Sequence, residues 1–200
     1  PMAERHDYIH TLSKIILNKT CRQIKRLEQE GYQIDRVSVN FSILEFRRKE
    51  FCKDVMEIIR QNEITYEKVA IELTESWNET EFDNIKNTIT SLQKLGIKFY
   101  LDDFGTGYSN FERIIGLPID VIKFDRSLTI LAGKNAESRY MVGSISDIFK
   151  NAHYEILFAG VENEKDEDQC KQMNALYLQG YKYSKPIPIE ELTRFLGRAV

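Results

Sequence analysis

The sequence predicts an α/β fold in which helices cover a parallel sheet of six strands. Two observations lead to this fold class. Six short segments are apolar along most of their length, which is typical of strands buried on both faces. Between most of them lie segments whose apolar side chains recur at helical spacing. No low-complexity segment, long linker or internal repeat interrupts this alternation.

The N-terminal part begins with a helical pattern and continues into a strand. Apolar side chains recur at near-helical spacing over residues 9–27, and a glycine follows where helices often end. The β-branched run VSVNFS, residues 37–42, predicts the first strand. Ser42 and Glu45 then form a capping-box pattern, which predicts the start of a helix that continues through Ile59.

The remaining elements continue the same alternation. VAIEL predicts the second strand at 69–73, a helical pattern occupies 82–95, and KFYLDD predicts the third strand at 98–103. The last three strands are expected at 121–125, 155–161 and 177–180, with a helical segment at 140–149 between the first two of them.

Length and charge bound the kind of protein. With 200 residues, of which 42% are hydrophobic, the chain can bury one core, and we expect one domain over residues 1–200. Its 28 basic and 31 acidic residues leave a formal net charge of -3, which excludes a broad basic face for duplex nucleic acid. A nucleotide partner therefore requires a local site.

Cysteine usage and hydropathy predict a soluble, cytoplasmic protein. Cys21, Cys52 and Cys170 are odd in number and lack CxxC spacing, which favours reduced thiols over a disulfide framework. No apolar run approaches the roughly 18 residues that a membrane span needs, and no signal peptide opens the chain, so we expect no membrane contact from this segment. Because the chain begins with proline, we expect it to be part of something longer.

Polar residues gather near the carboxyl ends of the predicted strands, which is where a (β/α) barrel builds its sites. Any one of them could instead cap a helix or form a turn. Several such polar residues at the same position of successive strands favour a functional site. The residues are Asn40, Glu72, Asp102, Asp103, Lys123 and Asp125.

Three of these residues offer the oxygen ligands that hard divalent cations prefer. Asn40 brings a carbonyl oxygen, and Glu72 and Asp102 bring carboxylates from the next two strands. The adjacent Asp103 would let a second ion lie nearby, with Asp102 between the two ions. Two such ions can generate a hydroxide and stabilise an in-line displacement at phosphorus.

The remaining polar residues complete this hypothesis. Lys123 supplies a positive charge for a phosphate oxygen or the attacking water, and Asp125 orients that lysine; the alternative is a purely structural lysine–aspartate pair. Residues 104–107, Phe-Gly-Thr-Gly, predict a loop that rearranges over a ligand, the alternative being a tight turn.

These residues lie in motifs that resemble the EAL-domain phosphodiesterases, which hydrolyse cyclic di-GMP to the linear dinucleotide pGpG. The resemblance covers almost the whole chain. It rests on motifs in family order: VSVNFS, ELTES, LDDFGTGYSN, LPIDVIKFDRS, GVE and QGYKYSKP. It implies a modified TIM barrel, a magnesium or manganese cofactor, cyclic di-GMP as ligand and a homodimer formed through the DDFG loop region.

The resemblance also implies a role for individual residues. Asn40, Glu72, Asp102 and Asp103 match metal ligands, Asp103 belonging to the second ion. Lys123, Asp125, Asp103 and Gln179 match residues of the catalytic site, Gln179 through the QGY motif. Glu75 matches the glutamate that stabilises the DDFG loop.

Two departures from the family pattern limit these implications. The Glu-Ala-Leu motif and the first two strands are absent from this chain, although a closed barrel needs more strands than six. We therefore expect N-terminal residues in the parent protein, a partner that covers the open barrel, or an unusual fold. Ala159 stands where the family has a catalytic-site glutamate, and Glu162 survives at a different position of that motif.

Three functions follow from these observations. The preferred one is a degenerate EAL domain, catalytically weak or inactive, that acts as a nucleotide receptor or regulator. The second is an active phosphodiesterase whose parent supplies the missing glutamate and in which another carboxylate replaces the one lost at Ala159. The third is an interaction domain without a ligand, against which the retained carboxylates and lysine argue.

Overall fold

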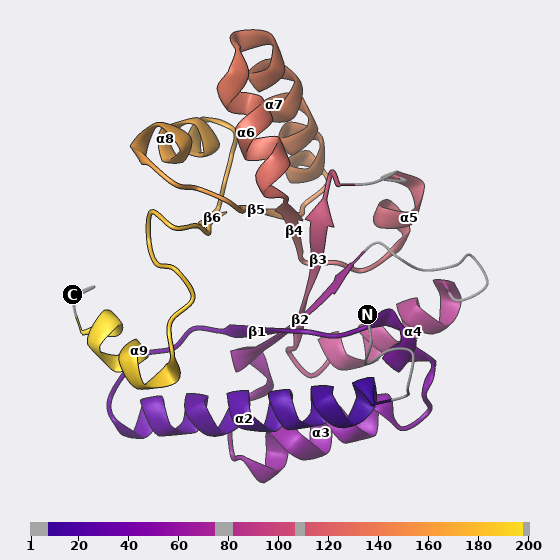
Figure 1. Ribbon diagram of the computed structural model, residues 1–200. Helices are drawn as coiled ribbons and strands as arrows, with labels where there is room; N and C mark the ends of the chain where they lie inside the picture. Colours follow the sequence, from indigo (N-terminus) through magenta and orange to yellow (C-terminus); the bar gives the residue numbers. More distant parts are fainter. Residues whose placement is uncertain (1–7, 75–81, 107–110, 198–200) are drawn as a thin grey trace. The chain divides into compact units, whose positions relative to one another are not determined.

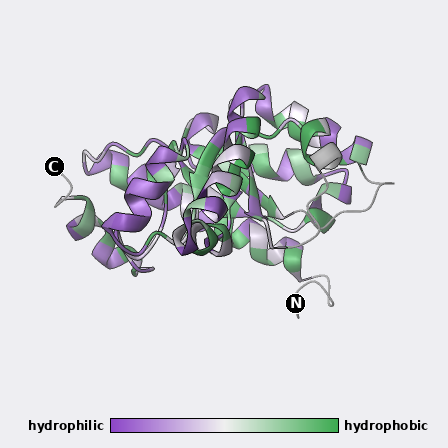
Figure 2. Ribbon diagram, turned by 90° about the horizontal axis from the view of Figure 1, so that it is seen from above, coloured by the Kyte–Doolittle hydropathy of each residue, from purple (hydrophilic) through white to green (hydrophobic). Residues whose placement is uncertain are grey.

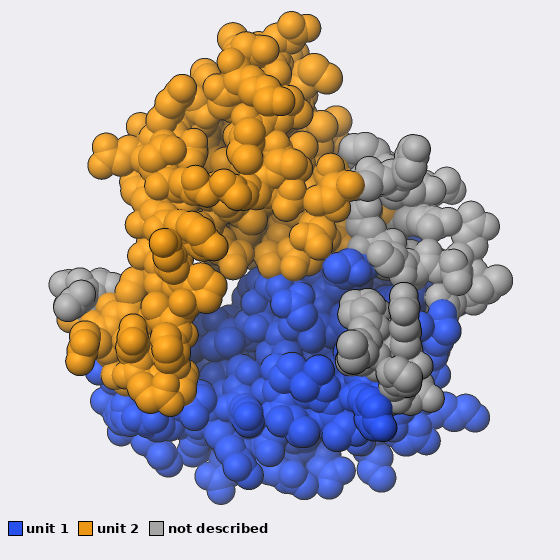
Figure 3. All heavy atoms as spheres, in the orientation of Figure 1, with its two compact units in different colours: residues 1–100, 115–118 blue, residues 101–114, 119–200 orange. Residues whose placement is uncertain are grey.

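The computed structural model describes residues 8–74, 82–106 and 111–197. Its internal contacts divide the chain into two compact units, coloured separately in Figure 3. Unit 1 comprises residues 1–100 and 115–118, and unit 2 comprises residues 101–114 and 119–200. The expectation of one domain over 1–200 stays a prediction.

The six predicted strands are all present and form one sheet in the order β1-β2-β3-β4-β5-β6, which confirms the α/β class. The pairs β1–β2, β4–β5 and β5–β6 are parallel. The strands are β1 Val37–Asn40, β2 Val69–Thr74, β3 Lys98–Phe104, β4 Val121–Phe124, β5 Glu155–Phe158 and β6 Tyr177–Leu178.

The strands also carry the apolar residues that predicted them. Figure 2 colours them predominantly as hydrophobic, and all four residues of β4 and the first five of β2 are buried. Burial along a whole strand, on both faces, is the pattern expected where helices cover a parallel sheet.

In unit 1, long helices pack together and against the first strand. Helix α2 contacts both α3 and β1, and Figure 1 shows α2 and α3 running side by side. The helical elements of this part are α2 Ile9–Gln29, the 3-10 turn η1 Ile43–Arg47, α3 Phe51–Gln61, the 3-10 turn η2 Tyr66–Lys68 and α4 Phe82–Gln93.

The capping box starts a shorter element than the sequence predicts. Ser42 and Glu45 do form the reciprocal cap, but it begins η1. Arg48 then adopts an extended backbone, with φ -83° and ψ 131°, so the chain cannot continue as a helix and α3 starts afresh at Phe51. The capping pattern predicted the start of a helical element at Ser42 correctly, whereas the length of that element was set by the extended backbone of Arg48.

Glu45 is a buried acid in unit 1. Its Oε2 atom accepts hydrogen bonds from Ser13 Oγ at 2.8 Å and from the Ser42 backbone N–H at 3.1 Å. Burial raises the pKa of this carboxyl above its usual 4.5, although the hydrogen bonds from Ser13 and Ser42 and the charge of Arg48 act in the opposite direction.

In unit 2, helices follow each strand, and asparagine or aspartate caps three of them. Asp125, Asn135 and Asn163 each accept a hydrogen bond from a backbone N–H in the first turn of the following helix. The helices from this part of the chain are α5 Phe111–Gly116, α6 Arg126–Lys134, α7 Ala136–Asn151, α8 Glu164–Gln172 and α9 Ile189–Leu196.

The core of unit 2 is a cluster of phenylalanine rings. Phe124 on β4 lies 5.1 Å from Phe104 and 4.7 Å from Phe158, and Phe149 of α7 stands edge-on to Phe104 at 5.0 Å. These rings fasten the ends of three strands to one helix, which fixes the strand termini that carry the predicted site.

The three cysteines are free, as predicted. Cys21 on α2 and Cys170 on α8 are fully buried, and burial raises their pKa to about 11 and about 12 respectively. Cys52 on α3 is half-buried, and burial raises its pKa as well. In the parts of the chain that the structure describes, no helix is both long and apolar enough to cross a membrane.

Candidate functional site

In unit 1, the predicted site residues Asn40 and Glu72 stand opposite each other in the register of β1 and β2. The Glu72 side chain is buried, with 5% of the residue exposed, while Asn40 is exposed. The Phe41 backbone N–H donates to the Glu72 carbonyl at 2.9 Å, which extends the pairing beyond the last residue of β1. The register thus makes the two residues neighbours, with Asn40 at the end of β1 and Glu72 two residues before the end of β2, while their role in a site stays a prediction.

In unit 2, an ion pair joins β3 to β4. Lys123 Nζ lies 2.9 Å from Asp102 Oδ1, and the exposed fractions of the two side chains are 7% and 20%. A buried ammonium group is tolerated only with such compensation, because removing a charge from water costs several kcal/mol, roughly, even after relaxation. The structure thus brings together the lysine and the first aspartate of the pair that the sequence singled out.

Asp103 differs from its neighbour in backbone and exposure. Its φ of 59° lies in the left-handed region, which aspartate tolerates better than most residues, and its side chain is exposed. Its N–H donates to Asp102 Oδ1 at 3.0 Å, and its carbonyl accepts two hydrogen bonds from Thr106, at 3.0 Å from the hydroxyl and 3.2 Å from the N–H. These bonds fix the turn in a conformation that costs about 1–2 kcal/mol.

Asp125 is the N-terminal cap of α6. Its Oδ1 accepts the Ser127 N–H at 2.8 Å. Burial would raise the pKa of this carboxyl, but the hydrogen bonds from Ser127 and the nearby charge of Arg126 outweigh burial and hold the pKa below its usual 3.8. The cap is one of the alternatives open for such a residue, and the orienting role toward Lys123 stays a prediction.

Ala159 occupies a backbone position that is held on both sides. Its N–H donates to the Phe124 carbonyl at 2.9 Å, and its carbonyl accepts the Thr129 hydroxyl at 2.7 Å. The next residue, Gly160, has a φ of 77°, and an added Cβ would lie 2.2–3.0 Å from Cγ, Cβ and Cα of Arg126. The backbone around Ala159 is therefore fixed.

Glu162, three residues after Ala159, has a partner of its own. Its Oε1 lies 2.6 Å from Nη2 of Arg126. This ion pair ties the β5–α8 turn to the first residue of α6, and it engages the carboxylate that stands nearest in sequence to Ala159. The sequence gives no signal for this pair, because Arg126 and Glu162 are distant along the chain and belong to no shared periodic pattern.

Gln179 follows β6 and is anchored through its backbone. Its N–H donates to the Phe158 carbonyl at 2.9 Å, and its own carbonyl accepts the Val161 N–H at 3.0 Å. The residue is exposed. The structure thus places Gln179 beside the same β5–α8 turn that carries Ala159, while the predicted loop-stabilising residue Glu75 lies outside the described residues.

The metal-ligating side chains of each unit determine how well that unit could hold a divalent ion. Over residues 8–74, 82–106 and 111–197, no group of three or more histidine, cysteine, aspartate or glutamate side chains is arranged to hold a metal ion. In unit 2, Asp102 and Asp103 are adjacent, but the lysine contact occupies one oxygen of Asp102. Within the described residues, neither unit by itself therefore offers a complete carboxylate cage for a divalent ion.

The fold and the site define an α/β protein with an acid–lysine site at the carboxyl ends of its strands. The sequence model of the EAL domain family matches residues 1–186, and the chain belongs to that family.

Among curated relatives, the oxygen sensor protein DosP of Escherichia coli is 27% identical over 197 residues, which are 98% of this chain and 25% of DosP. The cyclic di-GMP phosphodiesterase NbdA of Pseudomonas aeruginosa is 27% identical over 195 residues, again 98% of this chain and 25% of the relative. The chain thus spans about a quarter of the length of these two relatives.

Solved structures show the same fold. The phosphodiesterase PaMucR in complex with c-di-GMP has a TM-score of 0.86 and 26% identity, over 96% of this chain and 78% of that one. A calcium and cyclic di-GMP complex of BlrP1 from Klebsiella pneumoniae has a TM-score of 0.76 and 20% identity, over 87% and 44% of the two chains. These likenesses confirm the EAL type of α/β fold that the sequence predicted.

Proposed function

We propose that this EAL domain binds cyclic di-GMP and hydrolyses it weakly or not at all, so that it acts as a nucleotide receptor or regulator. The observation that carries this proposal is Ala159. Its backbone is fixed by Phe124 and Thr129, yet the carboxylate expected there is missing, and Glu162 is held by Arg126. Loss of a general base alone lowers turnover about 10²- to 10⁴-fold.

Retention of Lys123 and its neighbours supports binding. A buried ammonium group at the carboxyl end of β4 is suited to a phosphate oxygen, and it is partnered by Asp102. Phosphate and guanine recognition needs fewer groups than catalysis does. Two similar proteins carry cyclic di-GMP in their names: NbdA is named as its phosphodiesterase, and PaMucR was solved as its complex.

The cofactor, partner and location belong to the same proposal. Magnesium or manganese is the proposed cofactor; the resemblance matches its ligands to Asn40 and Glu72 of unit 1 and to Asp102 and Asp103 of unit 2, and with the carboxylate of position 159 absent we expect such an ion to bind weakly. We also propose a cytoplasmic domain, and a homodimer formed through the DDFG loop region. The alternative is an active enzyme that gives pGpG, if the parent protein supplies the missing glutamates.

Calorimetric titration with cyclic di-GMP, with and without Mg²⁺, tests the proposal beside a chromatographic assay for pGpG. We expect binding with slight turnover. Efficient metal-dependent hydrolysis by this chain would establish the active enzyme, and absence of binding even at high nucleotide concentration would favour the interaction domain.

A matched pair of variants identifies the binding site. We expect Lys123→Met to weaken binding about tenfold or more, the worth of one charge-assisted hydrogen bond. Lys134→Met, which removes an exposed lysine at the end of α6, should leave the affinity unchanged. Because Lys123→Met leaves Asp102 without this ion pair, the urea unfolding midpoint of the variant controls for misfolding.

A further inference from the structure

The segment after β6 is laid against the β5–α8 turn through two backbone hydrogen bonds to one residue. The Val161 N–H donates to the Gln179 carbonyl at 3.0 Å, and the Lys182 N–H donates to the Val161 carbonyl at 3.1 Å. Gly180 lies between them, and a Cβ there would come within 2.0 Å of the Val161 carbonyl oxygen. The backbones of the two segments are therefore in direct contact.

The same segment is short of apolar anchors. Tyr181 is 60% exposed and Tyr183 is 41% exposed, so the two aromatic side chains contribute little burial. Backbone bonds from Tyr183 and Ser184 to the Gly180 carbonyl close the segment into a turn, but they are internal to it. Besides the two backbone bonds to Val161, polar side-chain contacts therefore have to hold this turn against the rest of unit 2.

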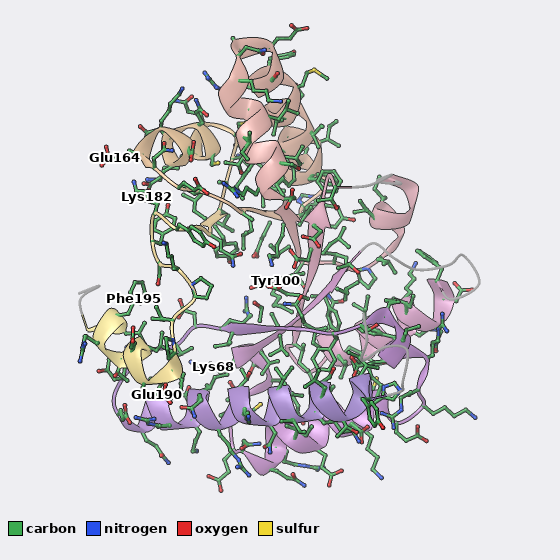
Figure 4. All side chains as sticks on the ribbon, viewed as in Figure 1. Lys68, Tyr100, Glu164, Lys182, Glu190 and Phe195 are labelled. Carbon is green, nitrogen blue, oxygen red and sulfur yellow. The ribbon has the colours of Figure 1, made fainter. Side chains whose placement is uncertain are left out.

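Lys182 supplies that connection. Its Nζ forms an ion pair with Oε2 of Glu167 on α8, and the exposed fractions of the two side chains are 24% and 17%. Figure 4 labels Lys182 on the segment between β6 and α9, with Glu164 at the start of α8 beside it. Glu167 is charged throughout the neutral range, because its hydrogen bonds to Lys171 and Lys182 lower its pKa to about 2.

Lys171 makes an ion pair with the same carboxylate, but this pair does not join α8 to another segment. Its Nζ lies 2.6 Å from Oε1 of Glu167, four residues earlier on α8, so this pair stays within one helix. The Lys182 pair joins α8 to a segment fifteen residues further along. Two lysines thus share one partner, but only Lys182 lies on the turn, where the Tyr183 side chain also hydrogen-bonds to Glu167.

We propose that Lys182 is a positioning residue: by tying its turn to Glu167 of α8, it holds Gln179 in place at the end of β6. This inference rests on the proposed function, and on the role in the cyclic di-GMP site that the resemblance implies for Gln179 through its QGY motif. The tether acts through the chain, since Gln179 and Lys182 bracket Gly180 and both are bonded to Val161.

Hydrogen exchange without nucleotide tests the tether by itself. In Lys182→Met we expect the backbone amides of Val161 and of residue 182 to exchange about tenfold faster, because their bonds open with the turn. Lys171→Met removes the same charge from the same carboxylate and should leave these amides as in the wild type. Equal acceleration in both variants, or none in Lys182→Met, would overturn the proposal.

Affinity for cyclic di-GMP then tests the consequence. Lys182→Met should weaken binding about tenfold while the thermal midpoint moves little, Lys182→Arg should restore it, and Lys171→Met should bind as the wild type does. Equal losses in Lys182→Met and Lys171→Met would assign the effect to charge alone and overturn the proposal. If the wild type does not bind, the proposed function fails, whereas the exchange experiment still decides the tether.

Discussion

Among the described glycines of unit 2, Gly180 is the one whose substitution by alanine should destabilise the fold most. Substitution by alanine would place Cβ 2.0 Å from the Val161 carbonyl oxygen, 2.4 Å from its nitrogen and 2.6 Å from its carbonyl carbon. All three are backbone atoms, which cannot turn away as a long side chain can. The two chain segments must therefore separate.

The cost of that separation follows from what is lost. The hydrogen bonds from Val161 to Gln179 and from Lys182 to Val161 both span the contact, and each is worth about 1 kcal/mol net. Strain from overpacking adds about 2 kcal/mol. We therefore expect Gly180→Ala to lower the free energy of unfolding of unit 2 by about 4 kcal/mol.

Urea unfolding followed by circular dichroism measures this loss. With a slope of about 2 kcal/mol per molar urea, the midpoint should fall by about 2 M. Gly143→Ala on α7 is the matched control, because its added Cβ would lie at an ordinary 3.5 Å from Met173 Cγ. Removing a glycine from a helix interior should raise stability by up to about 1 kcal/mol.

We expect the two substitutions to change the free energy of unfolding in opposite directions: Gly180→Ala lowers it and Gly143→Ala raises it. A Gly180→Ala protein whose midpoint stays within about 0.3 M of the wild type would refute the reasoning, since a shift that small corresponds to well under 1 kcal/mol. It would mean that the two backbones are not in the contact described.

Three further predictions concern other residues. The raised pKa of Glu45 makes the wild type lose stability as pH rises from 4.5 through the folded pKa, so Glu45→Gln should become more stable relative to the wild type over that window. Urea titrations at several pH values measure this difference, and equal pH profiles for the two proteins would contradict the cost of burying the charged carboxylate. Thr129→Val should cost about 1–2 kcal/mol of unfolding free energy, since the Ala159 carbonyl loses its hydroxyl donor, whereas Thr129→Ser should largely keep the bond. Ala159→Glu should raise Mg²⁺-dependent hydrolysis of cyclic di-GMP about 10²-fold, measured as pGpG by chromatography, and an unchanged rate would argue that the lost side chain is not what limits turnover.

The strands and the strand-end residues could be predicted because local patterns determine them. Apolar runs such as residues 69–73 and 121–125 have one stable environment, the interior of a covered sheet. Parallel strands then bring their carboxyl ends to one edge, which is why Asn40 and Glu72 are neighbours in register. The Asp102–Lys123 pair follows from the same geometry.

The remaining features depend on contacts that no local pattern encodes. The single helix predicted after the capping box is instead divided into η1 and α3, because the extended backbone of Arg48 interrupts it. The left-handed φ of Asp103 is imposed by the turn around it. The pairs Arg126–Glu162 and Lys182–Glu167 join residues far apart in sequence, on surfaces where many other charges could have served equally well.

The two buried thiols can report when the structure around each of them unfolds. Cys21 lies in unit 1 and Cys170 in unit 2, and both are inaccessible and hard to ionise, so alkylation must wait until the surrounding helix leaves the core. Pulsed labelling in increasing denaturant, with peptide mapping to separate the half-buried Cys52, would time the two events in unmodified protein. Matching labelling rates would identify a single cooperative transition, and diverging rates would identify two.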